Sequence, residues 1–193
     1  MGTRGFLTFA IDHQEKTSYI HADAYPEHQG LIVLRWLRDS AVNQVEVMYQ
    51  RARELRVVEP DSVPSAWDVE RLARHWRPIA GDRPPSWYSL LRGTQGDPAL
   101  MLEAGVMEGA RDWPCHPQAR WGYLIDLDAR RLEVYEGGRR EPHDRGRFAG
   151  RDPFMLGGLG FRPPALIASW PFRALPSDTA FVDDCYARAE VPG

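Results

Sequence analysis

The sequence predicts a single α+β domain over residues 1–193, in which helices cover a mainly antiparallel sheet. Two pairs of short β-type runs, each joined by a tight polar turn, and one late β-type run predict the strands. Helical periodicity fills the chain between the two pairs. A length of 193 residues fits one domain, and a hydrophobic content of 43% is enough for a core. Strands on both sides of a helical middle are typical of the α+β class.

The first pair of runs covers residues 5–11 and 16–22. Residues 5–11 are apolar and rich in β-forming side chains, and a polar turn follows them. Residues 16–22 then alternate, so that Thr17, Tyr19 and His21 share one face. This pattern predicts a β-hairpin at the start of the chain.

The middle of the chain shows helical spacing of apolar residues. A loop with Pro26 precedes it, Ser65 is a plausible N-cap, and Asp97-Pro98 is typical of a helix start. Trp36, Trp67 and Trp76 lie on the apolar stripes and are expected in the core. The expected helices cover about residues 31–39, 42–55, 65–77, 87–91 and 98–104.

The last third of the chain returns to β-type runs. Residues 121–127 and 131–135 predict a second hairpin, and residues 165–170 predict a late strand. Between them lies a long Arg/Gly-rich connection, residues 137–160, of a length at which loops are functional or mobile. Ser177 is expected to cap a last helix, which ends near residue 189.

Charge and motifs exclude several classes of function. A net charge of −3 disfavours a nucleic-acid partner. Lys16 is the single lysine among 24 basic residues, so no P-loop is present, and no other cofactor motif is found. No apolar run is long enough for a membrane span and no secretory leader is visible, so we expect a soluble, cytoplasmic protein that neither binds nor crosses a membrane.

The main candidate site follows the first hairpin. His21, Asp23, Tyr25 and His28 lie close together in the sequence, and Pro26 fixes a turn beside them. An imidazole and a carboxylate two residues apart can orient each other or share a polar ligand. In the alternative interpretation, Asp23 caps the turn and His21 packs at a sheet edge.

An amide or ester hydrolase is the second hypothesis. Thr3 could act as an N-terminal nucleophile, with Lys16 lowering the pKa of the terminal amine. Removal of Met1 would expose Gly2, however, so a further cleavage would be needed. Alternatively, His21 and Asp23 could form an acid–base pair.

Other motifs carry weaker signals. His21, Asp23 and His143 match a two-histidine, one-carboxylate metal set only through a permissive spacing, so no metal is predicted. Cys115 and His116 lie between two prolines and are expected in a rigid turn. The Gly-Gly-Leu-Gly sequence at 157–160 lacks dinucleotide-binding spacing and predicts a turn. The connection 137–160 is expected to be a solvated mixed-charge loop, with arginines 139, 140, 145, 147 and 151 interleaved with acids.

Three stretches together resemble a family of small uncharacterised bacterial and phage proteins. They are Met1-Gly2-Thr3-Arg4, the Asp23-Ala24-Tyr25-Pro26 segment before a helix, and the runs 121–128 and 132–135. The resemblance covers roughly a third of the chain. The family has no established activity and lends no catalytic residues, but it implies an accessory role linked to phage.

The leading hypothesis is therefore a binding protein that recognises rather than transforms its ligand. Arg4, Lys16, Tyr25 and His28 would bind a small polar ligand or a protein partner in a pocket near the first hairpin, beside His21 and Asp23. Trp113, Trp121 and Trp170 border loops and could wall such a pocket.

Overall fold

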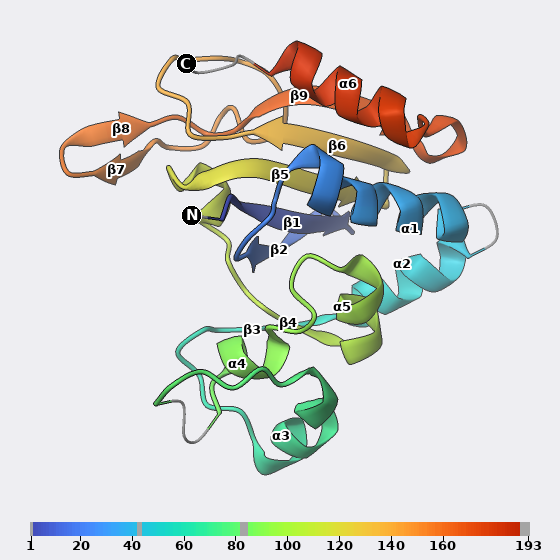
Figure 1. Ribbon diagram of the computed structural model, residues 1–193, viewed down its shortest axis with the longest axis vertical. Helices are drawn as coiled ribbons and strands as arrows, with labels where there is room; N and C mark the ends of the chain where they lie inside the picture. The colour runs from blue at the N-terminus through green and yellow to red at the C-terminus, as the bar shows by residue number, and fades with distance from the viewer. Residues whose placement is uncertain (1, 42–43, 82–84, 190–193) are drawn as a thin grey trace.

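A central five-stranded sheet organises the protein (Figure 1). The computed structural model describes residues 2–41, 44–81 and 85–189. The sheet has the strand order β2-β1-β5-β6-β9, and its neighbours are antiparallel except for the parallel pair β1–β5. The sheet strands are β1 (Arg4–Ile11), β2 (Gln14–Ile20), β5 (Ala119–Asp126), β6 (Arg131–Glu136) and β9 (Ala165–Pro171).

Both predicted hairpins are confirmed, and the backbone conformation of the turn residues explains why they form. Asp12 and His13 have φ angles of 50° and 60°, the left-handed conformation that a two-residue turn requires between twisted strands. Arg130, at the end of the β5–β6 turn, has a φ of 52°. The expected strand at 165–170 is β9, so the predicted α+β class with a mainly antiparallel sheet is confirmed.

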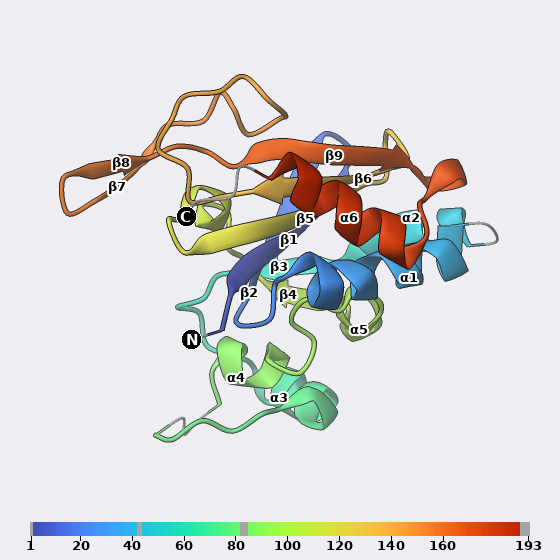
Figure 2. The same ribbon diagram turned by 45° about the horizontal axis from the view of Figure 1, so that its top comes forward.

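Helices cover one face of the sheet (Figures 1 and 2). Alternate residues of the strands, such as Leu7, Phe9 and Tyr123, pack against the helices and are fully buried. No helix in the described ranges has both the length and the apolar character that crossing a bilayer requires. The helices in this layer are α1 (Leu31–Ala41), α2 (Val45–Glu54), α5 (Pro98–Ala104) and α6 (Asp178–Arg188), and a π-helical turn η1 (Pro26–Gly30) leads into α1.

The long connection covers the opposite face. Phe148 is fully buried there, with its ring 5.6 Å from that of Phe6 and 4.7 Å from that of Tyr135. The expectation of one long loop over 137–160 is corrected, because the segment also contains a short hairpin, β7 (Phe154–Leu156) and β8 (Leu159–Phe161). The predicted glycine turn is confirmed at its tip, where Gly157 and Gly158 have positive φ angles.

The charges of this connection are not simply solvated, which corrects the mixed-charge-loop interpretation. Arg147 forms ion pairs with Asp126 and, at 3.2 Å, with Glu133 of the adjacent strands, and Arg151 forms one with Glu15. These carboxylates project from the same sheet face as Phe148. The arginines therefore fasten the connection across the sheet.

A smaller unit with its own buried cluster lies beyond the edge of the sheet. The two three-residue strands in it pair in parallel and were missed in the sequence, because three residues show no period. The predicted Ser65 cap is confirmed as a full capping box with Asp68. Trp67 was expected in the core, which is wrong, since 64% of it is exposed. The elements of this unit are β3 (Arg56–Val58), α3 (Ala66–Leu72), η2 (Ala73–His75), α4 (Trp87–Leu91) and β4 (Val106–Glu108).

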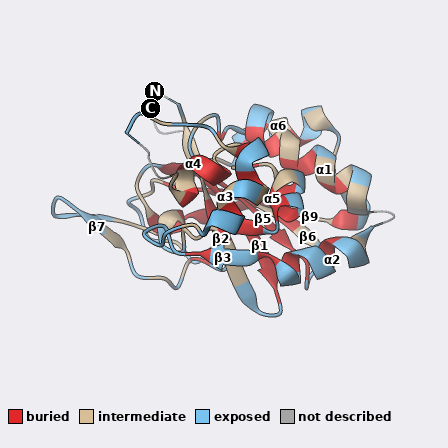
Figure 3. Cartoon of the chain, turned by 90° about the horizontal axis from the view of Figure 1, so that it is seen from below, coloured by how far each residue is buried: buried red, intermediate tan, exposed pale blue. Residues whose placement is uncertain are grey.

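The buried residues, coloured red in Figure 3, are concentrated in and around the central sheet. The hairpin β7–β8 projects from the body in Figure 2, and Met155 in the middle of β7 is 63% exposed. Cys115 and Cys185 are both buried and free, so they do not form a disulfide. Short 3₁₀ turns, η3 (Trp113–Cys115) and η4 (Phe172–Ala174), precede β5 and follow β9.

We expect Phe148→Ala to lower the free energy of unfolding by about 3–5 kcal/mol, because it removes the buried ring that joins the connection to the sheet. Chemical denaturation measures the loss, and limited proteolysis should show faster cleavage at the arginines around residue 148. Met155→Ala is the control, since truncating this exposed side chain should change stability by less than about 0.5 kcal/mol. Equal stability of the two variants would contradict the assigned role of Phe148.

Candidate functional site

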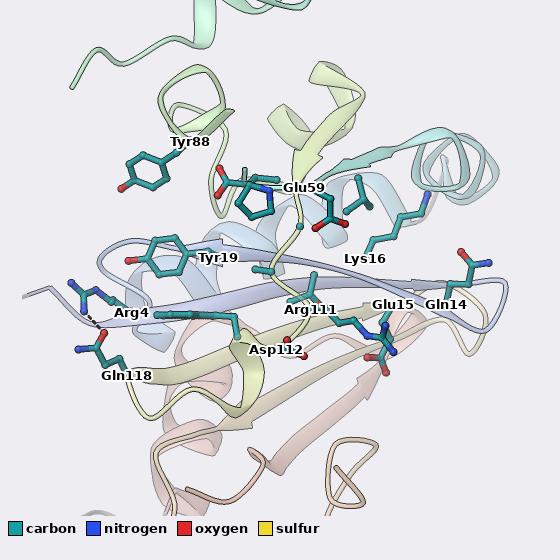
Figure 4. A pocket seen from close by; sticks show the side chains of 17 residues that line it. Arg4, Gln14, Glu15, Lys16, Tyr19, Glu59, Tyr88, Arg111, Asp112 and Gln118 are labelled. Atoms are coloured by element: carbon teal, nitrogen blue, oxygen red, sulfur yellow. Dashed lines mark hydrogen bonds between the residues drawn. The ribbon is translucent and has the colours of Figure 1, made fainter. Parts of the chain in front are cut away.

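A cleft of about 860 Å³ lies between the edge strand β2 and the smaller unit (Figure 4). Side chains of β2 form one wall. The other wall is formed by residues of β3 and β4 and by the residues that directly follow each of these two strands. The amide of Ala110 donates a hydrogen bond to the carbonyl of Thr17 at 2.8 Å, so the two walls are connected along the edge of the sheet. A pocket beside the first hairpin is where the sequence analysis expects the ligand.

One end of the cleft is basic and aromatic. Figure 4 shows Arg4 and Gln118 at this end, near Tyr19, with Tyr88 opposite. Arg4 Nη1 donates a hydrogen bond to Gln118 Oε1, which holds the guanidinium at the mouth of the first strand. Burial raises the pKa of the Tyr19 hydroxyl, so this group stays protonated and can donate a hydrogen bond.

Aromatic rings continue along this wall. The Trp113 ring lies edge-on to Tyr19 at 4.6 Å between centroids and is stacked on His116 at 4.1 Å. Trp113 Nε1 donates a hydrogen bond of 2.7 Å to the Gly5 carbonyl, which fixes the indole. Rings held in this way offer flat apolar surface next to the Arg4 charge.

The rest of the cleft lining has an excess of acids, with Glu15, Glu59, Glu108 and Asp112 against Lys16 and Arg111, and its distinctive group is Glu108 at the end of β4. Its Oε2 atom is buried and accepts no hydrogen bond from the described residues. Burial raises the pKa of the Glu108 carboxyl, and no neighbouring cation offsets this effect. Glu59 also lines the cleft but is exposed. A buried carboxyl without a partner is uncommon and has an unused capacity for one hydrogen bond.

Lys16 lines the same cleft, but its ammonium is already used. Nζ lies 2.8 Å from the carbonyls of Ala52 and Arg53 and 2.7 Å from that of Leu55, at the carboxyl end of α2. These three acceptors match the three N–H donors of an ammonium group. A guanidinium spreads its five donors over a plane and over three nitrogen atoms, so it does not meet three converging carbonyls from one atom as the ammonium of Lys16 does.

The remaining predicted residues lie outside the cleft lining. His21 borders it, with Nδ1 3.0 Å from the Tyr19 hydroxyl and 3.1 Å from that of Tyr88. Asp23 has a φ of 56°, and its carbonyl accepts a hydrogen bond from the Gln29 amide. No hydrogen bond or ion pair joins His21 to Asp23 in the described part of the chain.

The segment around Tyr25 starts a helix. The Tyr25 carbonyl accepts hydrogen bonds from the amides of His28 and Gly30, both at 3.1 Å, within the turn that leads into α1. Tyr25 and His28 are exposed on this turn, away from the cleft lining. The Tyr25-Pro26 sequence therefore has a local structural explanation.

Thr3 and Lys16 are far apart. The Thr3 carbonyl accepts a hydrogen bond from the Ala24 amide at 3.0 Å. Lys16 pairs with Phe9, six residues further along β1 than Thr3, which corresponds to roughly 20 Å of strand. The nucleophile–amine arrangement of the hydrolase hypothesis has no counterpart in this geometry.

The metal-binding and thiol motifs are likewise dispersed. His143 Nε2 lies 2.7 Å from the Pro163 carbonyl, and the described residues contain no group of three metal-type ligands. The predicted rigid turn at Cys115 is the 3₁₀ segment η3, and burial raises the pKa of its thiol. Trp121 packs in the main core rather than bordering a pocket.

Sequence reasoning missed Glu108, Tyr88 and most of the acidic wall. Glu108 is four residues beyond the end of α5, in a strand too short to show alternation. Tyr88 lies on a five-residue helix. No sequence pattern around Glu108 or Tyr88 indicates that these side chains lie beside the first hairpin. Trp113, which the sequence predicts as a possible wall of the pocket, does line the cleft.

Comparison of the chain with models of known protein families, with curated proteins and with solved structures gives no match. The chemistry of the cleft is therefore inferred from its own geometry.

We expect Lys16→Arg to lower the free energy of unfolding by about 1–3 kcal/mol, because the larger planar group leaves buried carbonyls without donors. Lys16→Met, which keeps the aliphatic stem, should cost at least as much. Urea denaturation of both variants measures the effect. If the arginine variant matches the wild type, the three-carbonyl explanation for this lysine is wrong.

The histidines at the cleft rim predict acid sensitivity. Burial, followed by the charges of Arg92 and Arg4, lowers the pKa of His21, and burial and Arg4 lower that of His116. The unfolded chain then binds more protons than the native state below about pH 6.5, so stability falls as the pH falls through this window. Urea denaturation at about pH 7.5 and pH 5.5 should show a smaller pH effect in His21→Gln/His116→Gln than in the wild type.

Proposed function

We propose that this protein is a binding protein that holds a small polar ligand in the cleft between β2 and the smaller unit. The observation that carries the proposal is the buried, unpartnered oxygen of Glu108 in a cleft whose other end presents Arg4 and fixed aromatic rings. A buried polar atom without a partner costs free energy, and a ligand that donates a hydrogen bond to it removes that cost. The cleft volume of about 860 Å³ is within the usual range for small-molecule sites.

The distribution of charge defines the ligand. Glu108 and Glu59 favour an amine or another hydrogen-bond donor, whereas Arg4 favours a carboxylate or another acceptor. The rings of Tyr19 and Trp113 favour a flat apolar part between the polar groups. The proposed ligand is thus a small molecule with a donor group, an acceptor group and an aromatic or similar flat body.

Recognition is a better description than catalysis. The Lys16 ammonium is occupied by three carbonyls, and His21 lies beside two tyrosine hydroxyls rather than a carboxylate. The thiol of Cys115, with its raised pKa, is a poor nucleophile. The cleft thus offers groups that bind a ligand but no activated nucleophile. An accessory role linked to phage stays a prediction from the resemblance of the sequence.

The binding test uses two simple probes, benzylamine for the acidic side and benzoate for the basic end. We expect benzylamine to bind the wild type, and Glu108→Gln to weaken it about tenfold, because a charge-assisted hydrogen bond contributes roughly 1.5–3 kcal/mol. Arg4→Gln should weaken benzoate to a similar extent. Isothermal titration calorimetry or chemical-shift perturbation measures both affinities.

Glu54→Gln is the matched control, since Glu54 is an exposed carboxylate on α2 that does not line the cleft. It should leave both affinities unchanged. Benzylamine affinity that responds equally to Glu108→Gln and Glu54→Gln would show non-specific attraction to the acidic surface. Absence of binding by both probes would refute the proposed ligand chemistry.

The Glu108→Gln variant also has an expected effect on stability. Because the Glu108 carboxyl has a raised pKa, the unfolded chain loses its proton at a lower pH than the native state does. The native state is therefore penalised above about pH 4.5, and Glu108→Gln should be more stable than the wild type at neutral pH, with the difference vanishing in acid. Urea denaturation of Glu108→Gln and of the wild type, at neutral pH and in acid, checks this result. A variant that is less stable than the wild type at neutral pH would contradict the assignment of an unpaired buried carboxyl.

A further inference from the structure

A second concave site lies at another part of the sheet and shares no lining residue with the cleft. It has a volume of about 760 Å³ and forms where the turn between β5 and β6, the end of β9 and the start of α2 meet. Three of its lining side chains are arginines, namely Arg130, Arg131 and Arg173. The others are apolar, so the described lining contains no carboxylate.

This concentration of positive charge contrasts with the rest of the molecule. The chain has a net charge of −3, and many arginines elsewhere in the molecule have a carboxylate within 4.0 Å, as Arg35, Arg53 and Arg147 do. Arg173 is exposed and has no hydrogen-bond or ion-pair partner among the described residues. Arg131 donates from Nε to the neutral Ser169 hydroxyl at 3.0 Å, and Asp126, which lies opposite Arg131 on β5, is ion-paired with Arg147.

The third arginine, Arg130, forms only an exposed ion pair. Arg130 Nη2 lies 3.2 Å from Glu46 Oε1, and these side chains are 62% and 80% exposed. An ion pair as exposed as this contributes little to stability and can exchange for another anion. All three guanidinium groups are therefore available, wholly or in part, to a ligand.

The backbone that carries these arginines is held in place. The amide of Phe172 donates a hydrogen bond of 2.9 Å to the carbonyl of Arg130, which links the β5–β6 turn to the end of β9. Arg131 pairs with Pro171 in the strand register. The backbone of Arg130 and Arg131 is thus hydrogen-bonded into the sheet, which reduces the entropic cost of arranging these two charges around a ligand.

The floor of the pocket is apolar. Phe172 is 8% exposed and belongs to the main core, and Val45, Ala129 and Pro171 complete the lining. A free inorganic ion would leave this surface in contact with water. A ligand with an apolar group next to its anionic group would cover it and gain additional binding free energy.

We propose that this pocket binds the phosphomonoester group of an organic phosphate, with the organic part of the ligand on the Phe172 surface. Guanidinium groups present their N–H donors in a planar fork that matches phosphate oxygens, and a phosphomonoester carries close to two negative charges at neutral pH. The proposal is independent of the ligand of the cleft, since the two sites have no residue in common.

Phenyl phosphate is the probe, and binding is measured by isothermal titration calorimetry and by chemical-shift perturbation. We expect saturable binding, about tenfold weaker in Arg173→Ala, because loss of one charged hydrogen-bonding partner costs roughly 1.5–3 kcal/mol. Arg131→Lys keeps the charge but removes the fork, and it should weaken binding as well. Inorganic phosphate should bind more weakly than phenyl phosphate, and phenol should not bind.

Arg188→Ala is the matched control. Arg188 is a half-exposed arginine on α6 that pairs with Asp184 and does not line the pocket. Its loss should leave the phenyl phosphate affinity unchanged, and so should Glu108→Gln in the cleft. Equal weakening by Arg173→Ala and Arg188→Ala would overturn the proposal in favour of diffuse charge attraction. No saturable binding, or equal affinity for phenol and phenyl phosphate, would also overturn it.

Discussion

The contact between the edge strand β2 and the end of α2 determines how the two parts of this protein are arranged. Lys16 donates three hydrogen bonds to the last carbonyls of α2, at the point where the chain leaves the helical layer and enters β3. Helix ends leave carbonyls without partners, and an unsatisfied edge strand invites further pairing. The Lys16 ammonium supplies donors to the free carbonyls at the helix end, and the hydrogen bond from the Ala110 amide to the Thr17 carbonyl pairs one backbone group of the edge strand. Together they place the smaller unit beside the sheet edge and so create the cleft.

The two faces of the sheet are closed by different means. Helices bury one face through aliphatic and aromatic packing, with Leu34 and Phe181 fully buried. The connection between β6 and β9 covers the other face with one buried ring, Phe148, and with the ion pairs of Arg147 and Arg151. The irregular part of this connection is therefore held on the sheet by ion pairs to strand carboxylates as well as by the buried ring. The sheet is thus rigid on both sides, and both proposed sites lie at its margins, where loops and strand ends leave concave surface.

Local signals predicted much of the fold but little of the candidate site. The hairpins were predictable because alternation and turn residues lie within a few positions of each other, and the caps at Ser65, Asp97 and Ser177 were predictable for the same reason. The strands β3 and β4 were not, since each has three residues and their pairing joins segments about fifty residues apart. The cleft contains Arg4 and Lys16, as expected, but Glu108 is the last residue of the unpredicted strand β4, and Glu59 directly follows β3.

The sequence by itself determined the class of fold, the positions of the hairpins and helix starts, and the low content of lysine, because these depend on composition and on neighbours along the chain. Only the tertiary structure decided that Lys16 serves a helix end, that Glu108 lacks a partner and that three arginines share a pocket. Each of these properties depends on which groups surround an atom in space. Burial and partnership are set by long-range packing, for which a single sequence has no periodic signal.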